Sequence, residues 1–147
     1  MEKVTKEIEE IVNRETRAWD TKDVDLLLTI FHPDFVWPFP RTPHSHDPIE
    51  WYFVLGRYDP QRWKKFYQEF FDTHSLTHNI REIIKTEISK EGDGAFAVVD
   101  TNTAGTVTNQ YGGASTATLP GMAHTIIGTI ARTYSASGFA LINTCLE

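Results

Sequence analysis

The chain has 147 residues, 40% of them hydrophobic and 23% charged, which is the composition of an ordinary globular protein. We expect a single domain spanning residues 1–147, long enough to bury a core. The formal net charge of −6 and the lack of basic clusters argue against nucleic-acid binding. The only cysteine, Cys145, excludes an internal disulfide, and no apolar run suits a secretory signal or a membrane span. We therefore expect a cytoplasmic protein that does not enter membranes.

Helices are predicted in the first part of the chain. Over residues 3–21, apolar residues recur at helical spacing, at Val4, Ile8, Ile11, Val12 and Trp19. Asp23 is a suitable N-cap for a shorter helix, Val24–Phe31, which Pro33 ends because the residue before a proline avoids helical geometry. A short strand, Phe35–Trp37, should follow. The prolines behind it restrict that strand to an edge or a pocket rim.

A third helix is predicted to start at Pro60, with Asp59 as its N-cap, and to run to about His74. One face of this helix carries Trp63, Tyr67, Phe70, Phe71 and His74. That stripe either faces the core or partly forms a pocket wall. Between the second and third helices, Asp47-Pro48 could cap a short helix that contains Trp51 and Tyr52.

After residue 75 the apolar period changes from helical to two, which predicts antiparallel strands. On Leu76–Ile88, one face would carry His78, Ile80, Ile84 and Ile88, and the other would carry Thr77, Asn79, Arg81, Lys85 and Glu87. A glycine-rich turn leads to Ala95–Thr103, where Phe96, Val98 and Asp100 share a face. Residues 104–120 suit a loop or a hairpin tip. Met122–Ser135 and Phe139–Leu146 form the last predicted pair.

Helices followed by antiparallel strands predict an α+β fold, in which N-terminal helices pack on the concave face of a strongly curved sheet, as a cone-shaped barrel. The mouth of such a cone is a natural ligand site.

The order of elements resembles the nuclear transport factor 2-like superfamily, including its SnoaL-like and ketosteroid isomerase-like members. RETRAWDTKDVDLLLTIFHPDFVW resembles the opening helix pair and first strand, AFAVVD the middle strand, and GTIARTYSASGFALINTCL the closing hairpin. Gly128 and Tyr134 fit the family pattern of that hairpin, whereas Thr129 and Phe139 replace its usual Arg and Trp. The resemblance implies the cone fold and a homodimer, and it leaves the activity open because the fold hosts enzymes and binding modules alike.

His78 and Asp100 are the catalytic candidates. Ketosteroid isomerases carry their base on the first strand, but no carboxylate lies between Phe35 and Pro40 here. Scytalone dehydratases use a His–Asp arrangement. If both candidates face the concavity, the imidazole would be a general base held by the carboxylate. The alternative is a core histidine and an aspartate that bonds backbone groups.

Aromatic residues crowd the first half of the chain and predict an apolar pocket for a small hydrophobic molecule. The predicted ligand-binding residues are Trp37, Phe39, Trp51, Tyr52, Tyr67, Phe71, His124 and Asn143. Either Tyr52 or Tyr67 would donate its hydroxyl to a ligand carbonyl, or each is a core or rim tyrosine. Arg132, of the same parity as His124, is a further candidate. His44, His46, His74 and His78 have metal-ligand spacing, but their predicted positions favour no metal site and we expect no cofactor.

Two functions are compatible with these residues. The first is a cofactor-independent isomerase or dehydratase acting on a small hydrophobic carbonyl compound. The second is a non-catalytic ligand-binding or assembly module. On both readings we expect a homodimer formed through the outer sheet face, where Thr125, Thr129, Ala131 and Thr133 would permit close packing.

Overall fold

The computed structural model describes residues 2–36, 39–41, 47–91, 94–108, 114–115, 122–131 and 140–145, and the backbone alone at some of these positions. The helices are α1 (Glu2–Thr21), α2 (Val24–Leu28), α3 (Pro60–Thr73) and the 3-10 turn η1 (Pro48–Glu50). The strands are β1 (Phe39–Pro40), β2 (Trp51–Tyr52), β3 (His74–Ile88), β4 (Gly94–Thr108), β5 (Ala114–Ser115), β6 (Met122–Ala131) and β7 (Ala140–Cys145).

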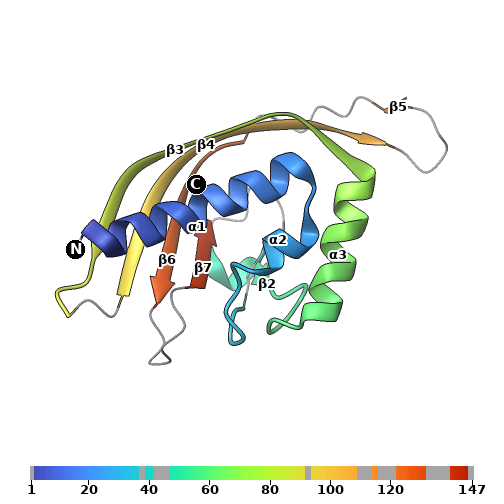
Figure 1. The fold of residues 1–147 in the computed structure, drawn as a ribbon. Coiled ribbons are helices and arrows are strands. Elements are labelled where there is room, and N and C mark those ends of the chain that lie inside the picture. The colour runs from blue at the N-terminus through green and yellow to red at the C-terminus, as the bar shows by residue number, and fades with distance from the viewer. Residues whose placement is uncertain are drawn as a thin grey trace.

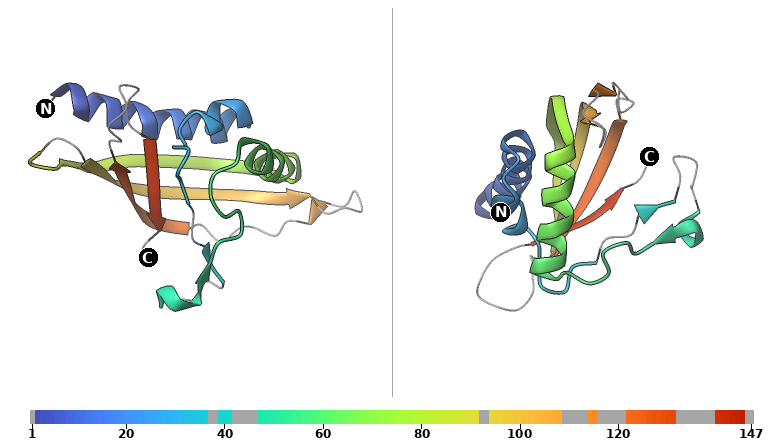
Figure 2. Two further views of the ribbon diagram at one scale, coloured as in Figure 1. Left: turned by 90° about the horizontal axis from the view of Figure 1, so that it is seen from below. Right: turned by 90° about the vertical axis from the view of Figure 1, so that its right-hand side faces the viewer.

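The main sheet is antiparallel, with the strand order β3-β4-β6-β7, and β5 pairs with the far end of β4. It curls around the helices without closing, and α1 lies along its concave face (Figure 1). β1 and β2 form a separate hairpin that projects away from α1 and the sheet (Figure 2). The predicted α+β architecture, with helices on the concave face of a curved sheet, is confirmed.

Local sequence explains where the helices begin and end. The Asp59 carboxylate accepts a 2.7 Å hydrogen bond from the Arg62 N–H, and Pro60 occupies the first helical position of α3. Asp23 caps α2 in the same way, through the Leu26 N–H. Both predicted caps are confirmed, although α2 ends at Leu28 rather than Phe31.

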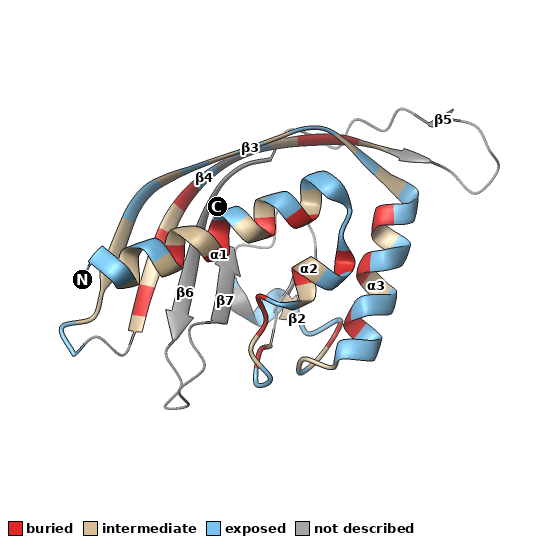
Figure 3. Cartoon of the chain, viewed as in Figure 1, coloured by how far each residue is buried: buried red, intermediate tan, exposed pale blue. Residues whose placement is uncertain are grey.

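The core lies between α1, α2, α3 and the sheet (Figure 3). Trp63 is fully buried at its aromatic centre, where its ring contacts Phe31, Phe35 and Tyr58 with centroid separations of 4.9–5.4 Å. The apolar stripe of α3 therefore faces the core, with Trp63, Tyr67 and Phe71 all buried. Such rings supply much of the apolar area that stabilises a domain of this size.

Two β-bulges in β3 change the predicted faces of that strand. The register against β4 shifts between Leu76 and His78, and again between Ile83 and Lys85. Each bulge reverses the alternation of side chains along the strand. As a result Ile83 and Ile88 pack against the core, whereas Ile80 and Ile84 are 61% and 59% exposed. The prediction that Ile80, Ile84 and Ile88 share one face is therefore wrong.

Other predictions are corrected near the projecting hairpin. In the described part of the predicted strand Phe35–Trp37, Val36 forms an isolated bridge with Arg57, and Trp37 lies outside the described residues. Trp51 and Tyr52 form strand β2 after the η1 turn, not a helix, and pair with β1. β4 also continues to Thr108, so the start of the predicted 104–120 loop belongs to the sheet.

Gly105 of β4 lies against the backbone of β3. A Cβ at this position would lie 2.7 Å from the backbone oxygen of Ser75, which is too close for any side chain. We expect Gly105→Ala to lower the free energy of unfolding by about 1–3 kcal/mol, because the backbone must shift. Urea denaturation checks this, with Gly94→Ala as control, where the nearest atom is 3.8 Å away. Equal effects of the two substitutions would contradict the close approach.

Candidate functional site

A buried ion pair joins α1 to the concave face of the sheet. Arg81 Nη1 lies 2.8 Å from Glu15 Oε2, and the two side chains are only 10% and 8% exposed. Among the residues that the structure describes, Glu15 is the one charged residue that is buried. A charge pair removed from water to this extent is costly to build, and removing either partner leaves an uncompensated buried charge.

Polar groups around Arg81 extend this pair into a network. The side-chain oxygen of Asn79 accepts hydrogen bonds from Arg81 Nε at 3.4 Å and from the Thr103 hydroxyl at 2.9 Å. The Asn79 amide nitrogen donates to Asp20 at 3.0 Å. Asp20 comes from α1, Asn79 from β3 and Thr103 from β4. Asp20 and Thr103 therefore hold Asn79, which in turn helps to orient the Arg81 guanidinium toward Glu15.

Aromatic side chains of α1 and α3 lie beside the network. Trp19, one helical turn after Glu15, contacts Tyr67, Phe70 and Phe71 edge to face, at centroid separations of 5.1–6.1 Å. Its indole nitrogen is buried and has no hydrogen-bond partner among the residues that the structure describes. A buried donor without an acceptor next to a charged pair is able to bind a ligand oxygen. Farther along the core, burial of the half-buried Tyr58 beside Trp63, and next to it the Asp59 carboxylate, raise the pKa of that phenol.

Two of the predicted ligand-binding residues, His124 and Asn143, occupy backbone positions on the same face of the sheet as Arg81. His124 on β6 pairs with Thr101, which pairs in turn with Arg81. Asn143 on β7 pairs with Gly128, which pairs with the buried Ala97. Directly paired positions belong to one face of a sheet. Both therefore occupy concave-face positions, while their side chains lie outside the described part of the structure.

The proposed catalytic role of His78 and Asp100 required both side chains to face the concave side of the sheet. In the structure neither does. Both are exposed on the outer face of the sheet. His78 Nε2 lies 2.7 Å from the side-chain oxygen of Asn102, and Asp100 lies opposite Glu82. The cause is the register of β3, which turns Asn79 and Arg81 inward and their neighbours outward. The expected meeting of imidazole and carboxylate inside the cone is therefore wrong.

The remaining predicted ligand-binding residues are spread over three environments. Tyr67 and Phe71 are buried, 4% and 3% exposed, in the aromatic core. Trp51 is half-buried, and Tyr52 is 40% exposed on the projecting hairpin. Trp37, Arg132, His44, His46 and the side chain of Phe39 lie outside the described residues. No single pocket of the described residues brings Trp51 and Tyr52 together with Tyr67 and Phe71.

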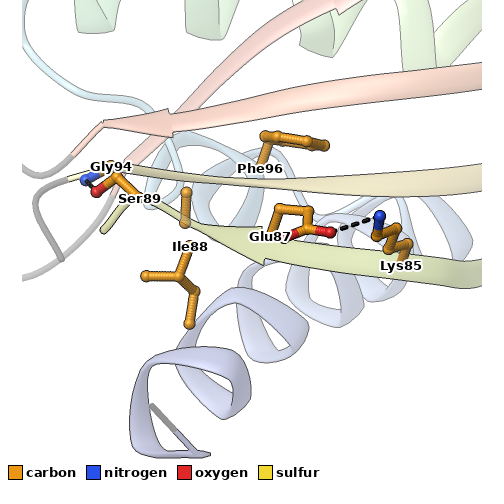
Figure 4. A pocket seen from close by; sticks show the side chains of 7 residues that line it. Lys85, Glu87, Ile88, Ser89, Gly94 and Phe96 are labelled. Atoms are coloured by element: carbon orange, nitrogen blue, oxygen red, sulfur yellow. Dashed lines mark hydrogen bonds and ion pairs between the residues drawn. The ribbon is translucent and has the colours of Figure 1, made fainter. Parts of the chain in front are cut away.

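An open hollow of about 530 Å³ lies at the turn end of β3 and β4 (Figure 4). Lys85 and Glu87 on its rim form an ion pair with each other. The Ser89 hydroxyl oxygen accepts a hydrogen bond from the Gly94 N–H. These polar groups satisfy one another, so the hollow offers a ligand mainly the apolar surfaces of Ile88, Ala95 and Phe96. The chemistry favours the Glu15–Arg81 network as the candidate site.

Neither Glu15 nor Arg81 is among the catalytic candidates that the sequence suggests. The periodicity of α1 contains a signal for Glu15, because it continues the buried stripe of Ile8, Ile11 and Val12 at helical spacing. A carboxylate on such a stripe requires a buried partner. Arg81 gives no comparable signal, since its inward direction depends on the register of β3.

The described helices include none that is long and apolar enough to cross a lipid bilayer. No curated protein matches the sequence.

Three solved structures show the likeness in fold. A ketosteroid isomerase-like protein of Erwinia carotovora atroseptica has a TM-score of 0.59 at 17% identity, covering 92% of this chain and 87% of that one. A candidate dehydratase of the NTF2-like family from Streptomyces avermitilis has a TM-score of 0.57 at 12% identity, with 100% and 99% coverage. A candidate aromatic ring hydroxylase of Novosphingobium aromaticivorans has a TM-score of 0.56 at 18% identity, with 100% and 92% coverage.

The family assignment comes from the sequence itself. The profile of the SnoaL-like domain matches residues 12–128, which include Glu15, the whole of α3 and the β3–β4 ladder. The curled sheet with helices on its concave face is the fold that the three structural neighbours share with this chain. The chain therefore belongs to the SnoaL-like family of the nuclear transport factor 2-like superfamily.

Proposed function

We propose that the chain is an isomerase- or dehydratase-like enzyme that acts on a small hydrophobic carbonyl compound at the concave face of its sheet. The observation that carries this proposal is the buried Glu15–Arg81 pair beside an aromatic wall. The printed names of the neighbours, isomerase-like and candidate dehydratase, are compatible with proton-transfer chemistry. We also propose that the protein resides in the cytoplasm, as its single cysteine suggests.

The residues have distinct roles in this proposal. The Glu15 carboxylate removes a proton from the carbon next to the substrate carbonyl. The negative charge that develops on the carbonyl oxygen is stabilised by donors of the Arg81 guanidinium, which has five N–H groups, and by the indole N–H of Trp19. Asn79 keeps the guanidinium in place. The rings of Trp19, Tyr67 and Phe71 bind the apolar part of the substrate.

Hydrogen–deuterium exchange at carbon tests this reaction without knowledge of the natural substrate. A panel of small cyclic and aromatic ketones and enones is incubated with the protein in D₂O, and exchange beside the carbonyl is followed by NMR. We expect the wild-type protein to accelerate exchange in at least one compound. Glu15→Gln should slow that exchange about a hundredfold, because the amide cannot accept the proton.

The matched control is Glu82→Gln, which makes the same chemical change on the exposed outer face of β3. This variant should exchange substrate as fast as the wild type. Circular dichroism at the assay temperature confirms that Glu15→Gln is folded. The proposal fails if the wild type accelerates exchange in no member of the panel, or if folded Glu15→Gln is as active as Glu82→Gln.

We further propose that the protein is a homodimer and that a second copy covers the outer face of its sheet. The exposure of Ile80 and Ile84 supports this, because large apolar side chains in one strand favour a covered surface. The backbone register pairs Thr125 with Asp100 and Thr129 with Phe96, both outward positions of β4, so the predicted small residues belong to the same face. Thr133 lies outside the described residues.

A further inference from the structure

Asp20 lies in the last turn of α1, where a carboxylate is unfavourable. The free backbone carbonyls at the C-terminal end of a helix make that end negative, so cations are favoured there and anions are not. The last turn of α1 contains no basic residue. Within the described ranges, the Asp20 carboxylate has one hydrogen-bond partner, the amide nitrogen of Asn79 at 3.0 Å. A side chain that breaks a local preference in this way is expected at a functional site.

The contact with Asp20 determines which way round the Asn79 amide lies. The amide oxygen accepts from Arg81 Nε and from the Thr103 hydroxyl, so the amide nitrogen needs an acceptor on its other side. An ionised carboxylate accepts hydrogen bonds and donates none. Turning the amide over would therefore place two oxygens against each other at Asp20 and two N–H donors against each other at Arg81.

We propose that Asp20 is a positioning residue, which acts on the Arg81 guanidinium through the Asn79 amide. The inference rests on the proposed function, in which donors of Arg81 stabilise the negative charge on the carbonyl oxygen. Arg81 Nη1 also lies 2.8 Å from Glu15 Oε2, so a guanidinium that turns loses its alignment with the base as well. Asp20 is exposed and lies outside this pair. Its loss should therefore lower the rate of proton transfer without weakening substrate binding.

The exchange of the Arg81 Nε proton with water tests this contact without any substrate. NMR of the ¹⁵N-labelled full chain measures the rate once that proton has been assigned. Asp20→Ala should accelerate the exchange about fivefold, the factor expected for the loss of one hydrogen bond. Asp20→Asn keeps an oxygen that accepts from the Asn79 amide, so it should restore most of the protection.

Asp72 supplies the matched control, because it repeats the chemistry of Asp20 on another helix. It is exposed in the last turn of α3, and its carboxylate accepts a 2.9 Å hydrogen bond from the Gln68 side-chain amide. Asp72→Ala should leave the exchange of the Arg81 proton unchanged. Both alanine variants should keep the wild-type midpoint in urea, because each removes an exposed aspartate from a helix C-terminus.

Kinetics of the deuterium-exchange assay at carbon give the catalytic consequence. With a compound that the wild type accepts, Asp20→Ala should lower kcat about fivefold and leave KM nearly unchanged, since Asp20 does not contact the substrate. Asp20→Asn should recover most of this loss, and Asp72→Ala should behave as the wild type. A purely structural role of Asp20 predicts the reverse, a lower midpoint in urea with no change at the Arg81 proton.

The outcomes separate this inference from the proposed function. If Asp20→Ala accelerates exchange of the Arg81 proton no more than Asp72→Ala does, the inference is overturned and the proposed function stands. Equal effects of Asp20→Asn and Asp20→Ala also overturn it, because the charge would then act rather than the hydrogen bond to Asn79. If the wild type exchanges no compound while Asp20→Ala still releases the Arg81 proton, the proposed function fails and the link from Asp20 to Arg81 stands.

Discussion

Replacing Arg81 with methionine should lower the free energy of unfolding by about 3–5 kcal/mol, measured by urea denaturation. The Glu15 carboxylate would remain between α1 and the sheet without its cation, where it is only 8% exposed. Much of the loss is the cost of leaving that charge buried, rather than the strength of the pair itself.

The double variant separates these two contributions. Glu15→Leu together with Arg81→Met should recover most of the lost stability, because both charges are removed and the volume is nearly kept. The control is Lys65→Met, which breaks the exposed Lys65–Glu69 pair and should change stability by less than about 1 kcal/mol. If Arg81→Met costs no more than Lys65→Met, the Glu15–Arg81 pair is accessible to water and its place in the candidate site is wrong.

Truncating Trp63 to alanine should cost about 3–5 kcal/mol of folding free energy. Its ring is fully buried and contacts Phe31, Phe35 and Tyr58. These residues come from two segments that flank α3 in space, after α2 and before α3 in the chain, so the surrounding structure has little freedom to collapse into the space. Urea denaturation of the variant, with an unchanged slope against urea, measures this loss.

Phe53→Ala is the matched aromatic control, because that ring is 62% exposed on the projecting segment. It should change the unfolding free energy of the monomer by no more than about 0.5 kcal/mol. A comparable loss at both positions would show that the aromatic cluster around Trp63 is not the centre of the core.

Helix positions and caps were predictable because their signals are local. Asp59 and Pro60 mark the start of α3, and the buried side chains of Trp63, Tyr67 and Phe71 repeat at helical spacing. The projecting hairpin was not predictable in this way. Trp51 and Tyr52 occupy a strand that is defined by pairing with Phe39 and Pro40, eleven or more residues earlier in the chain.

The candidate site was predictable only in part, because its key residues depend on register. Fold class, and the backbone positions of His124 and Asn143 on the concave face, follow from strand order and parity. The facing of His78 and Arg81 depends on where β3 carries its extra residues, and nothing in its alternating sequence marks a bulge. A strict period of two therefore exchanges the inner and outer faces of this strand.

The same bulges bear on how readily the exposed edge of this sheet could pair with another strand. In the sheet as described, β3 is an edge strand of 15 residues, and a regular edge of that length would offer a long row of backbone donors and acceptors to any passing strand. The interruptions near Leu76 and Ile83 divide the row into short pieces with different twist. Neither the central piece nor the terminal ones present a long flat template, so edge-to-edge growth into fibrils is disfavoured by backbone shape, independently of any side chain.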